Sequence, residues 1–402
     1  MDKSGTIAGI CSSLCDGGYS VKFRGFGAID KYLGMSALPY TWIETNADIA
    51  VLARFIENLR FPGVEIADGA TDISGATYYF RCLDYDDQKE SGFSFPLLSF
   101  GYDWKTRHFQ DPLGVYPLLR GLGKNEENSL ASSDPDHAPP RYFSRYRVIM
   151  DAALIMARYN FTGFPRLSAS GPKEPLPPPE FQRAYLCCLL VSPRPDRGLE
   201  LLKRSGLLKE LWPELACFDD VDHSKEFHPE GNVWNHTLET FRHRKSPNGA
   251  LKGGTFDLCL SLGLLLHDMG KPISASFGNH RFDGHAELGA RAATRFLERL
   301  EFNPSLIQDI FYLVKNHMLP AALKRLPLTK TAEIMSSPLF PTLMELYRCD
   351  ESSSFKGLDG YYENSAAYQA YLRNLKNPYR SADGKKMGKS ERRRQSRRQS
   401  WG

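Results

Sequence analysis

Histidines and aspartates that could ligate a metal ion gather in the second half of the chain. His267 and Asp268 stand side by side where the apolar run FDLCLSLGLLL ends. Other candidates lie at the start or end of predicted helices, and two of them share a face with apolar residues by their i, i+4 and i+7 spacing. These further candidates are His236, His285, His317 and Asp350.

A polar side chain on a helix face that packs into the core loses solvation free energy. A buried ionised carboxylate loses several kcal/mol of solvation unless a cation or hydrogen bonds compensate it. A single such residue is usually a satisfied polar group of the core, whereas several that converge from different helices favour a metal ion. Imidazole together with carboxylate suits Zn, Mn, Fe, Ni or Mg. With one coordination position open, such an ion could acidify a water molecule and orient a phosphate for attack.

The elements that must position these residues change in kind along the sequence. Alternating apolar residues and Gly/aromatic-rich runs such as ATYYFRCLDY predict strands mixed with helices in the first part. Two polar, Pro-rich stretches, Asn125 to Pro140 and Ser168 to Glu180, are expected to be linkers or surface loops, and the periodicity after them is helical. The predicted fold is an α+β head (1–140), a mostly α-helical neck (141–225), an all-α domain (226–378) and a disordered basic tail (379–402).

The bulk properties narrow the class of protein. The 402 residues are 42% hydrophobic, which is enough for two or three domains. Neither a membrane span nor a signal peptide is recognisable, so we expect a cytoplasmic protein without a membrane partner. Eight scattered cysteines without a CxxC pair argue against a zinc ribbon and against a disulfide framework.

The basic character of the chain lies in its tail. From Tyr379 to Gly402 nine Lys/Arg stand against two Asp/Glu, whereas the whole chain has a net charge of only +4. Such a segment has too few apolar residues to order itself. It could attract RNA, DNA or an acidic surface by counterion release, or it could serve solubility alone.

The arrangement of the histidines resembles the HD phosphohydrolase superfamily, in which a His, a His-Asp pair and a distant Asp surround a metal ion. The matching runs are NHTLE, LLLHDMGKP, FDGHAE and VKNHM. The resemblance implies a divalent ion (Mn, Mg, Ni, Fe or Zn), with the ligands His236, His267, Asp268 and Asp350. It also implies catalytic roles for Asp268 and for Lys271, which would contact phosphate. By the same likeness, a second metal or the substrate phosphate would lie at His285 and His317, while Asp359 competes with Asp350 for its place.

The upstream sequence resembles bacterial tRNA nucleotidyltransferases and poly(A) polymerases. The likeness runs through GYSVKFRGFGAIDKYLG, FQDPLGVYPLLRG and AYLCCLLVSPRPDRGLELLKRSGLLKELWPELA. That family carries an Asp-x-Asp pair just after its Leu-Gly, to hold the metal ions for nucleotidyl transfer, and here the two positions are Tyr40 and Trp42. Its glycine pair reads Gly25 and Phe26, which puts a phenyl ring where the backbone should approach phosphates.

These departures concern the chemistry of the head. Two-metal transfer needs clustered carboxylates that hold ions about 3.5–4 Å apart, and aromatic rings cannot ligate Mg²⁺. We therefore predict a degenerate head that remains as a folded scaffold. Glu44, Asp48 or the acidic run Leu83 to Asp87 could instead replace the carboxylates, and Tyr40 and Trp42 could stack on RNA bases.

Three functions are open at this point. The first is a metal-dependent HD phosphohydrolase or phosphodiesterase that acts on nucleotides or RNA ends, on a frame whose transferase site is lost. The second is a working tRNA CCA-adding or poly(A) polymerase-type nucleotidyltransferase. The third is an RNA-binding protein that holds RNA, including tRNA, with its head and tail, and in which the HD metal is structural.

Overall fold

The protein, described from a computed structural model, divides into two compact units. Unit 1 comprises Met1–Ala216, Lys245–Ser261 and Arg299–Phe302, and unit 2 comprises Cys217–Arg244, Leu262–Glu298 and Asn303–Gly402. The structure describes residues 5–62, 67–83, 93–123, 128–129, 144–159, 161–162, 167–170, 174–221, 231–245, 257–277, 282–354, 357–377, 379–381 and 385–386.

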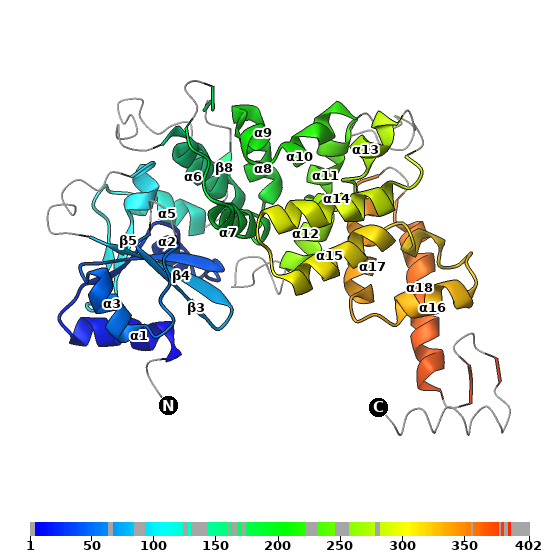
Figure 1. The fold of residues 1–402 in the computed structure, drawn as a ribbon, viewed down its shortest axis with the longest axis horizontal. Coiled ribbons are helices and arrows are strands. Elements are labelled where there is room, and N and C mark those ends of the chain that lie inside the picture. Colours follow the sequence, from blue (N-terminus) through cyan, green and yellow to red (C-terminus); the bar gives the residue numbers. More distant parts are fainter. Residues whose placement is uncertain are drawn as a thin grey trace. The chain divides into compact units, whose positions relative to one another are not determined.

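A six-stranded mixed sheet forms the head in unit 1 (Figure 1). Its spatial order is β3-β4-β2-β1-β5-β6, in which β2 and β4 are parallel and the other neighbours antiparallel. The chain passes from β2 to β4 through a helix and through β3, because parallel strands cannot be joined by a tight hairpin. The strands are β1 (Val21–Arg24), β2 (Tyr40–Thr45), β3 (Gly69–Ile73), β4 (Ala76–Cys82), β5 (Gly101–Asp103) and β6 (Phe109–Gln110).

The helices of the head are short and carry their own start signals. They are α1 (Ile7–Asp16), α2 (Phe26–Leu33), α3 (Ile49–Phe55), η2 (Pro96–Ser99) and α5 (Tyr116–Gly123). Thr6 caps α1 and Asp48 caps α3, each by accepting a hydrogen bond from a backbone N–H of the first turn. Helix α1 buries Leu14 in a core that also contains Ile43 of β2 and Phe80 of β4.

The rest of unit 1 is mostly helical. It contains α6 (Arg145–Arg158), α7 (Pro179–Leu190), α8 (Pro195–Ser205), α9 (Leu207–Leu211), α10 (Pro213–Ala216) and a short strand pair, β7 (Asn128–Ser129) with β8 (Phe161–Thr162). Gly198 lets α8 approach α6, since a Cβ there would lie 2.7 Å from the Ala153 carbonyl oxygen. A buried ion pair between Arg158 and Asp30, 2.7 Å long, joins α6 to α2.

The named elements in the described part of unit 2 are helices, as predicted. Gly263 lets α12 meet α17 closely, because a Cβ at this position would lie 2.9 Å from Leu346. The elements are η4 (Cys217–Asp220), α11 (Val233–Arg242), α12 (Leu258–Leu266), α13 (Lys271–Ser276), α14 (His285–Arg299), α15 (Pro304–Asn316), η5 (Pro320–Ala322), α16 (Leu328–Met335), α17 (Phe340–Ser352) and α18 (Asp359–Lys376), with the first residues of α12 and the last of α14 counted in unit 1.

The predicted fold class is confirmed: an α+β head is followed by helical segments. The predicted domain boundaries near 140, 225 and 378 stay predictions. Pro179 begins α7, so the second Pro-rich stretch ends earlier than we expected. All eight cysteines are free thiols, and none of the described helices is long and apolar enough to cross a membrane.

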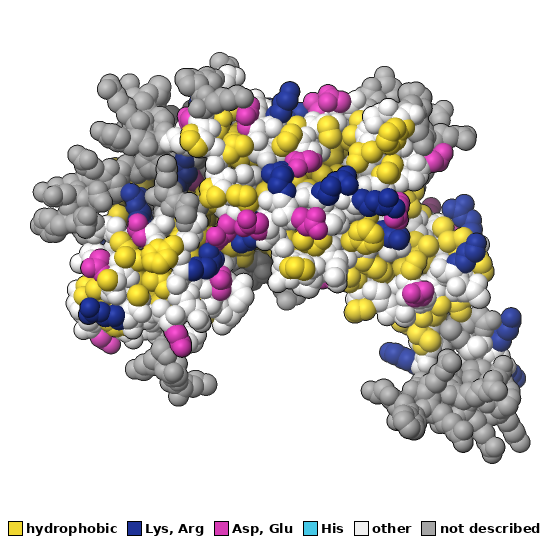
Figure 2. Space-filling view, in the orientation of Figure 1, with side chains coloured by type: hydrophobic (Ala, Val, Ile, Leu, Met, Phe, Trp, Pro, Cys, Tyr) yellow, Lys and Arg dark blue, Asp and Glu magenta, His cyan; other side chains and the backbone are white. Residues whose placement is uncertain are grey.

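Charge is distributed evenly over the visible surface. On the face in Figure 2, Lys/Arg and Asp/Glu side chains of the described residues alternate and do not gather into one basic patch. Most of the basic tail, from residue 387 onward, lies outside the described residues.

Candidate metal centre

Three histidines of unit 2 have their rings oriented by the backbone at a helix end. In each case Nδ1 lies within hydrogen-bond distance of the carbonyl oxygen three residues earlier: His267 with Leu264 (2.9 Å), His285 with Phe282 (2.7 Å) and His317 with Val314 (2.7 Å). A carbonyl only accepts, so Nδ1 carries the hydrogen and Nε2 keeps a lone pair. Leu264 and Val314 lie in the last turns of α12 and α15, where the last four carbonyls have no partner within the helix, whereas Phe282 precedes the start of α14.

The fourth histidine, His236, is oriented by a side chain instead. Its Nδ1 lies 3.1 Å from Ser353 Oγ, and that hydroxyl donates to the Asp350 carbonyl oxygen at 2.6 Å. The hydroxyl therefore accepts from Nδ1–H, which leaves Nε2 to face the Asp350 carboxylate at 2.9 Å. In all four rings, therefore, Nδ1 faces the oxygen atom that orients the ring and Nε2 points away from that oxygen.

The Nε2 atoms meet in two pairs. His236 and His267 approach to 3.3 Å, and His285 and His317 to 3.1 Å. Two lone pairs at this distance repel each other unless a positive charge lies between them, either a shared proton or a metal ion. The donor set therefore fits a cation, and imidazole nitrogen with carboxylate oxygen is a ligand combination that divalent transition metals accept.

Asp268 connects the two pairs. Its Oδ2 lies 3.3 Å from His267 Nε2 and 3.8 Å from His236 Nε2. Its Oδ1 lies 3.6 Å from His285 Nε2 and 3.9 Å from His317 Nε2. Among the described residues, the groups able to hold a metal are therefore two, His236–His267–Asp268 and Asp268–His285–His317, each with ligand atoms within 4.8 Å of one another.

The centre is buried but open on one side. His236, His267, Asp268 and His317 are each 1% exposed. Side chains of His285, Lys271 and Asp350 keep 11%, 12% and 23% of their surface exposed, so solvent reaches the centre past them.

The electrostatics favour the ligating forms of these groups. Burial lowers the pKa of His317 to about 4 and also lowers the pKa of His285, so both rings are neutral at pH 7. Burial alone would raise the pKa of Asp268, but His267 and Lys271 hold it well below its usual range. The pKa of Asp350 is likewise lowered, because the contact with His236 outweighs burial.

Lys271 contacts the centre from the first turn of α13. Its Nζ lies 2.7 Å from Asp268 Oδ2 and 5.9 Å from the centre of the Phe282 ring. The ammonium of Lys271 thus stands beside the Asp268 carboxylate, and a divalent cation bound at the cluster would attract an anionic phosphate.

Gly270, between the ligands and Lys271, is required by packing. A Cβ at this position would lie 1.9 Å from the His285 carbonyl oxygen and 2.6 Å from the Gly289 backbone nitrogen. The glycine thus lets the backbone after Asp268 touch the first turn of α14, which carries His285. The two metal-binding groups are held together by this backbone contact.

The structure brings every predicted HD residue to this centre, and Asp350 rather than Asp359 faces the histidines. Asp359 is exposed at the start of α18. Two contributors were missed: Ser353 and Phe282. A serine three residues after Asp350 has no distinctive pattern, and Phe282 acts through a carbonyl presented at φ 55°, an unusual conformation for a non-glycine residue.

The four head residues that depart from the nucleotidyltransferase pattern lie in or next to the strands and helices of the sheet. Gly25 has φ 55°, caps α2 and donates its N–H to the Phe100 carbonyl, so the glycine keeps a backbone role. Phe26 begins α2 and stacks on Tyr159 with ring centres 6.2 Å apart. The phenyl ring thus has a packing partner within unit 1.

Tyr40 and Trp42 lie on one face of β2 and pack on Tyr79 of β4. The Trp42 and Tyr79 rings are 5.4 Å apart and inclined by 14°, and Tyr40 stacks on Tyr79 at 6.2 Å. Phe181 of α7 meets the Trp42 ring edgewise at 6.4 Å. These aromatic residues fill the positions of the expected carboxylates with a packed stack.

The alternative carboxylates of the head are engaged in other contacts. Glu44 pairs with Arg24 at 2.9 Å, and Asp48 accepts from Val51 N–H as the cap of α3. Of the acidic run, Leu83 is described and residues 84–87 lie outside the described residues. No pair of free carboxylates appears in the described part of the head that could hold two ions.

Comparisons with known proteins agree with the sequence patterns. Residues 233–337 match the family model of the HD domain. The predicted HD resemblance is confirmed. Asp350 lies beyond the matched residues, so its assignment rests on its contacts in the structure.

The similar proteins include nucleotidyltransferases. The CC-adding tRNA nucleotidyltransferase of Thermus thermophilus is 35% identical over 185 residues, which are 44% of this chain and 40% of that protein. The bifunctional uridylyltransferase/uridylyl-removing enzyme of Mycobacterium tuberculosis is 30% identical over 207 residues, 51% of this chain and 23% of that protein. The chain thus covers less than half the length of these relatives.

A solved structure gives a weaker match. The tRNA nucleotidyltransferase complexed with a primer tRNA and an incoming ATP analogue shares 12% identity, with a TM-score of 0.43 over 91% of this chain and 99% of that chain. The predicted likeness to tRNA nucleotidyltransferases therefore rests on the sequence relatives and not on this structural match.

Proposed function

We propose that unit 2 is a metal-dependent HD phosphohydrolase or phosphodiesterase that acts on nucleotides or RNA ends. The observation that supports this best is the convergence of four Nε2 atoms and two carboxylates. His236, His267, Asp268 and Asp350 would hold one divalent ion, and Asp268, His285 and His317 a second ion or the substrate phosphate. Such an ion supplies Lewis-acid activation of phosphate and lowers the pKa of water.

The remaining chemistry belongs to residues at the open side. Lys271 is fixed 2.7 Å from Asp268 and partly exposed, so its ammonium can bind a phosphate oxygen as well as a carboxylate. His285 has a lowered pKa and is partly exposed, and it can accept a proton or a hydrogen bond from the substrate when it is not a ligand. The buried His236 and His267 keep the other side of the centre closed to solvent.

One relative supports a removal reaction by its name. The Mycobacterium tuberculosis protein is named for both uridylyl transfer and uridylyl removal, and it matches about half of this chain. That name thus combines a transfer reaction with a removal reaction in one protein.

The test is phosphate release by purified full-length protein. After treatment with a chelator, Mn²⁺, Mg²⁺, Ni²⁺, Fe²⁺ and Zn²⁺ are added separately and the protein is screened against nucleotides, cyclic phosphodiesters and RNA with a 3′ phosphate. We expect activity with at least one metal, lost in His267→Ala and in Asp268→Ala. His243→Ala is the matched control, because this histidine follows the end of α11 and lies 3.5 Å from Glu239, and no group able to hold a metal among the described residues includes it. Unchanged metal content and unchanged phosphate release in both ligand variants would refute the proposal.

The sequence relatives favour a second candidate more directly than the first. Nucleotidyl transfer to tRNA is what the Thermus thermophilus relative is named for, so a retained transferase fits the comparisons better than a hydrolase does. The opposing observation is the aromatic stack at Tyr40 and Trp42, with Glu44 already paired to Arg24. The loss of the transferase site therefore stays a proposal of ours.

A transfer assay separates the two candidates. The protein is incubated with tRNA that lacks its 3′ end, labelled CTP and ATP, and Mg²⁺ or Mn²⁺. Incorporation that survives His267→Ala would establish transfer in the head and refute its loss. Absence of both incorporation and phosphate release, together with RNA binding that weakens on removal of the basic tail, would instead support an RNA-binding protein with a structural metal.

A further inference from the structure

Phe282 has a backbone conformation that suits glycine better than phenylalanine. Its φ of 55° lies in the left-handed region, where a side chain strains the backbone and glycine does not. The turn requires this conformation, because the Phe282 carbonyl oxygen accepts from the His285 backbone N–H at 3.0 Å and faces His285 Nδ1 at 2.7 Å. A glycine would present the same carbonyl without strain, and the same turn already contains Gly284 at φ 77°. The phenyl ring therefore needs an explanation of its own.

The ring lies beside the ammonium of Lys271. Nζ of this lysine is 5.9 Å from the centre of the ring, within the range of a cation–π contact, and 2.7 Å from Asp268 Oδ2. Phe282 is partly buried, and the Lys271 side chain keeps 12% of its surface exposed, on the side from which solvent reaches the centre. The ammonium thus contacts a carboxylate and an aromatic ring at the open side of the candidate metal centre.

The carboxylate and the ring respond differently to a cation at the centre. Asp268 belongs to both metal-binding groups, so a bound ion competes with Lys271 for this carboxylate and repels its ammonium. The phenyl ring is not a ligand for a divalent ion and keeps its contact with the ammonium. Since a lysine side chain is a flexible chain that carries a point charge, the ring limits where this charge lies once the carboxylate is shared.

We propose that Phe282 is a positioning residue, whose ring holds the Lys271 ammonium where it binds a phosphate oxygen of the substrate. This inference rests on the proposed function, in which Lys271 contacts phosphate. The carbonyl of Phe282 serves His285 and its ring serves Lys271, so one residue orients both a metal ligand and a phosphate-binding group.

The test is titration calorimetry of the full-length protein with inorganic phosphate, after loading with the divalent ion that the protein binds most tightly. Phe282→Leu keeps an apolar side chain at the same φ but removes the π face, and it should weaken phosphate binding by about threefold to fivefold. Phe282→Tyr keeps the ring and should bind phosphate as the wild type does. Phe311→Leu is the matched control, because it removes the ring that lies 5.5 Å from Lys315 Nζ, outside the two metal-binding groups. Its phosphate affinity should be unchanged.

A double-mutant cycle separates positioning from a purely structural role. In the Lys271→Met background, Phe282→Leu should have no further effect on phosphate affinity, because the ring acts through the ammonium. Phe282→Gly keeps the carbonyl that orients His285 and relieves the backbone strain. It should therefore retain the metal content of the wild type and yet weaken phosphate binding as much as Phe282→Leu does, whereas a misfolded variant would lose both.

The inference is overturned if phosphate does not bind to the wild type, if Phe282→Leu binds it equally tightly, if Phe282→Tyr is as weak as Phe282→Leu, or if the effect persists in Lys271→Met. Phosphate binding does not require turnover, so this inference and the proposed function fail separately. Hydrolysis of a substrate, with equal phosphate affinities in Phe282→Leu and the wild type, would refute the positioning role alone. The expected loss of affinity without hydrolysis of any substrate would refute the hydrolase alone.

Discussion

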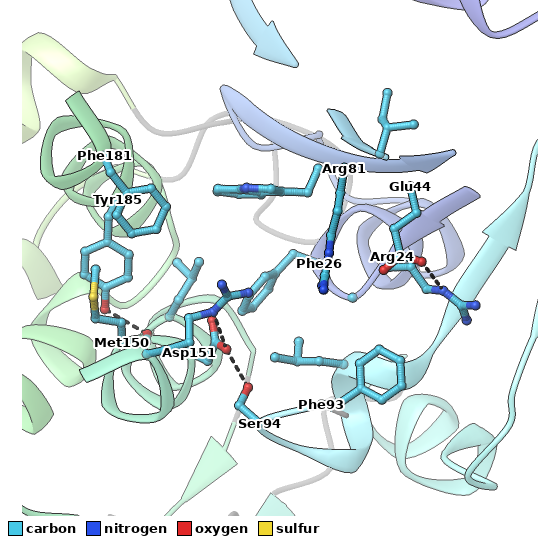
Figure 3. A pocket seen from close by; sticks show the side chains of 16 residues that line it. Arg24, Phe26, Glu44, Arg81, Phe93, Ser94, Met150, Asp151, Phe181 and Tyr185 are labelled. Atoms are coloured by element: carbon cyan, nitrogen blue, oxygen red, sulfur yellow. Dashed lines mark hydrogen bonds and ion pairs between the residues drawn. The ribbon is translucent and has the colours of Figure 1, made fainter. Parts of the chain in front are cut away.

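The candidate metal centre and unit 1 both contain carboxylates, but the surroundings of these carboxylates differ. In unit 1, Glu44 and Asp151 each pair with their own arginine (Figure 3), and the buried Asp30 pairs with Arg158. In the candidate metal centre, Asp268 faces four histidines and contacts Lys271, whereas Asp350 faces His236 and His267. A carboxylate paired with a guanidinium has its charge compensated within the chain, whereas a carboxylate beside converging imidazole nitrogens is part of a ligand set that suits a metal ion. The presence of acidic residues alone therefore does not favour a metal site; their combination with converging imidazoles does.

The largest effect is expected for the carboxylate that lies in both candidate metal-binding groups. Asp268→Ala removes the oxygen atoms that both metal-binding groups share, so the metal content should fall to the background and phosphate release by more than about 100-fold. Asp151→Ala is the counterpart on α6, and it should leave metal content unchanged. Metal analysis of both purified variants checks the comparison, and metal retained in Asp268→Ala would contradict it.

Loss of an aromatic ring should damage the head alone. Trp42→Ala removes a ring that stacks on Tyr79 and Phe181, and because the indole is only partly buried we expect the free energy of unfolding to fall by about 2–3 kcal/mol. Denaturant unfolding measures this effect. Metal content per folded chain should remain that of the wild type, and a loss of metal would show that the two regions are coupled.

Substitutions at two glycines of unit 2 test the effect of a steric clash apart from the effect of an unfavourable backbone conformation. Gly270→Ala places a methyl group on the His285 carbonyl, an overpacking that costs about 1–3 kcal/mol and displaces the first turn of α14. Gly284→Ala meets no atom within 4 Å, and only its φ of 77° is unfavourable. We expect metal affinity to fall in the first variant and to be kept in the second, as measured by titration with the metal found in the protein.

A smaller effect is expected for the hydroxyl that orients His236. Ser353→Ala leaves Nδ1 of this histidine without its acceptor, and loss of such an outer contact lowers metal affinity by about tenfold or more. Ser354→Ala is the control, since its hydroxyl donates to the Glu351 carbonyl and, among the described residues, has no contact with His236. Equal affinities in the two variants would exclude an orienting role for Ser353.

A pH dependence is expected for the metal-free protein. The pKa of His317 is about 4 in the folded chain against 6.5 for an unperturbed histidine, so the unfolded state binds more protons between these values. The melting temperature of chelator-treated protein should therefore fall as the pH is lowered from about 6.5 to about 4. His317→Asn should show a shallower fall, and an identical profile would contradict the assignment.

The sequence was sufficient to group the residues of the candidate metal centre, because most of them stand near helix ends with regular spacing. His267, His317 and Asp350 could be placed on inward faces from periodicity, and the HD pattern connected them with His236 and His285. The oxygen atoms that orient the imidazole rings could not be predicted. Every residue has a backbone carbonyl, so the sequence does not distinguish the ones that accept from a histidine, and Ser353 is one of three consecutive serines.

The head was harder to predict for a different reason. Substitution of the Asp-x-Asp pair by Tyr40 and Trp42 is visible in the sequence, but the pairing of Glu44 with Arg24 depends on the register of two strands. Sequence analysis therefore left Glu44 as a possible metal ligand, and the structure gives it a cationic partner instead.

The anchoring of the imidazoles has a consequence for how the centre tolerates mutation. His267, His285 and His317 take their tautomer from carbonyls that every amino acid supplies, so exchange of the residue three positions earlier does not remove the acceptor. His236 alone depends on a side chain that a single nucleotide change can delete. Random mutation should therefore impair metal binding by the group of His236 and His267 sooner than metal binding by the group of His285 and His317. In a mutational scan, position 353 should be far more sensitive than positions 264, 282 and 314 are for metal binding.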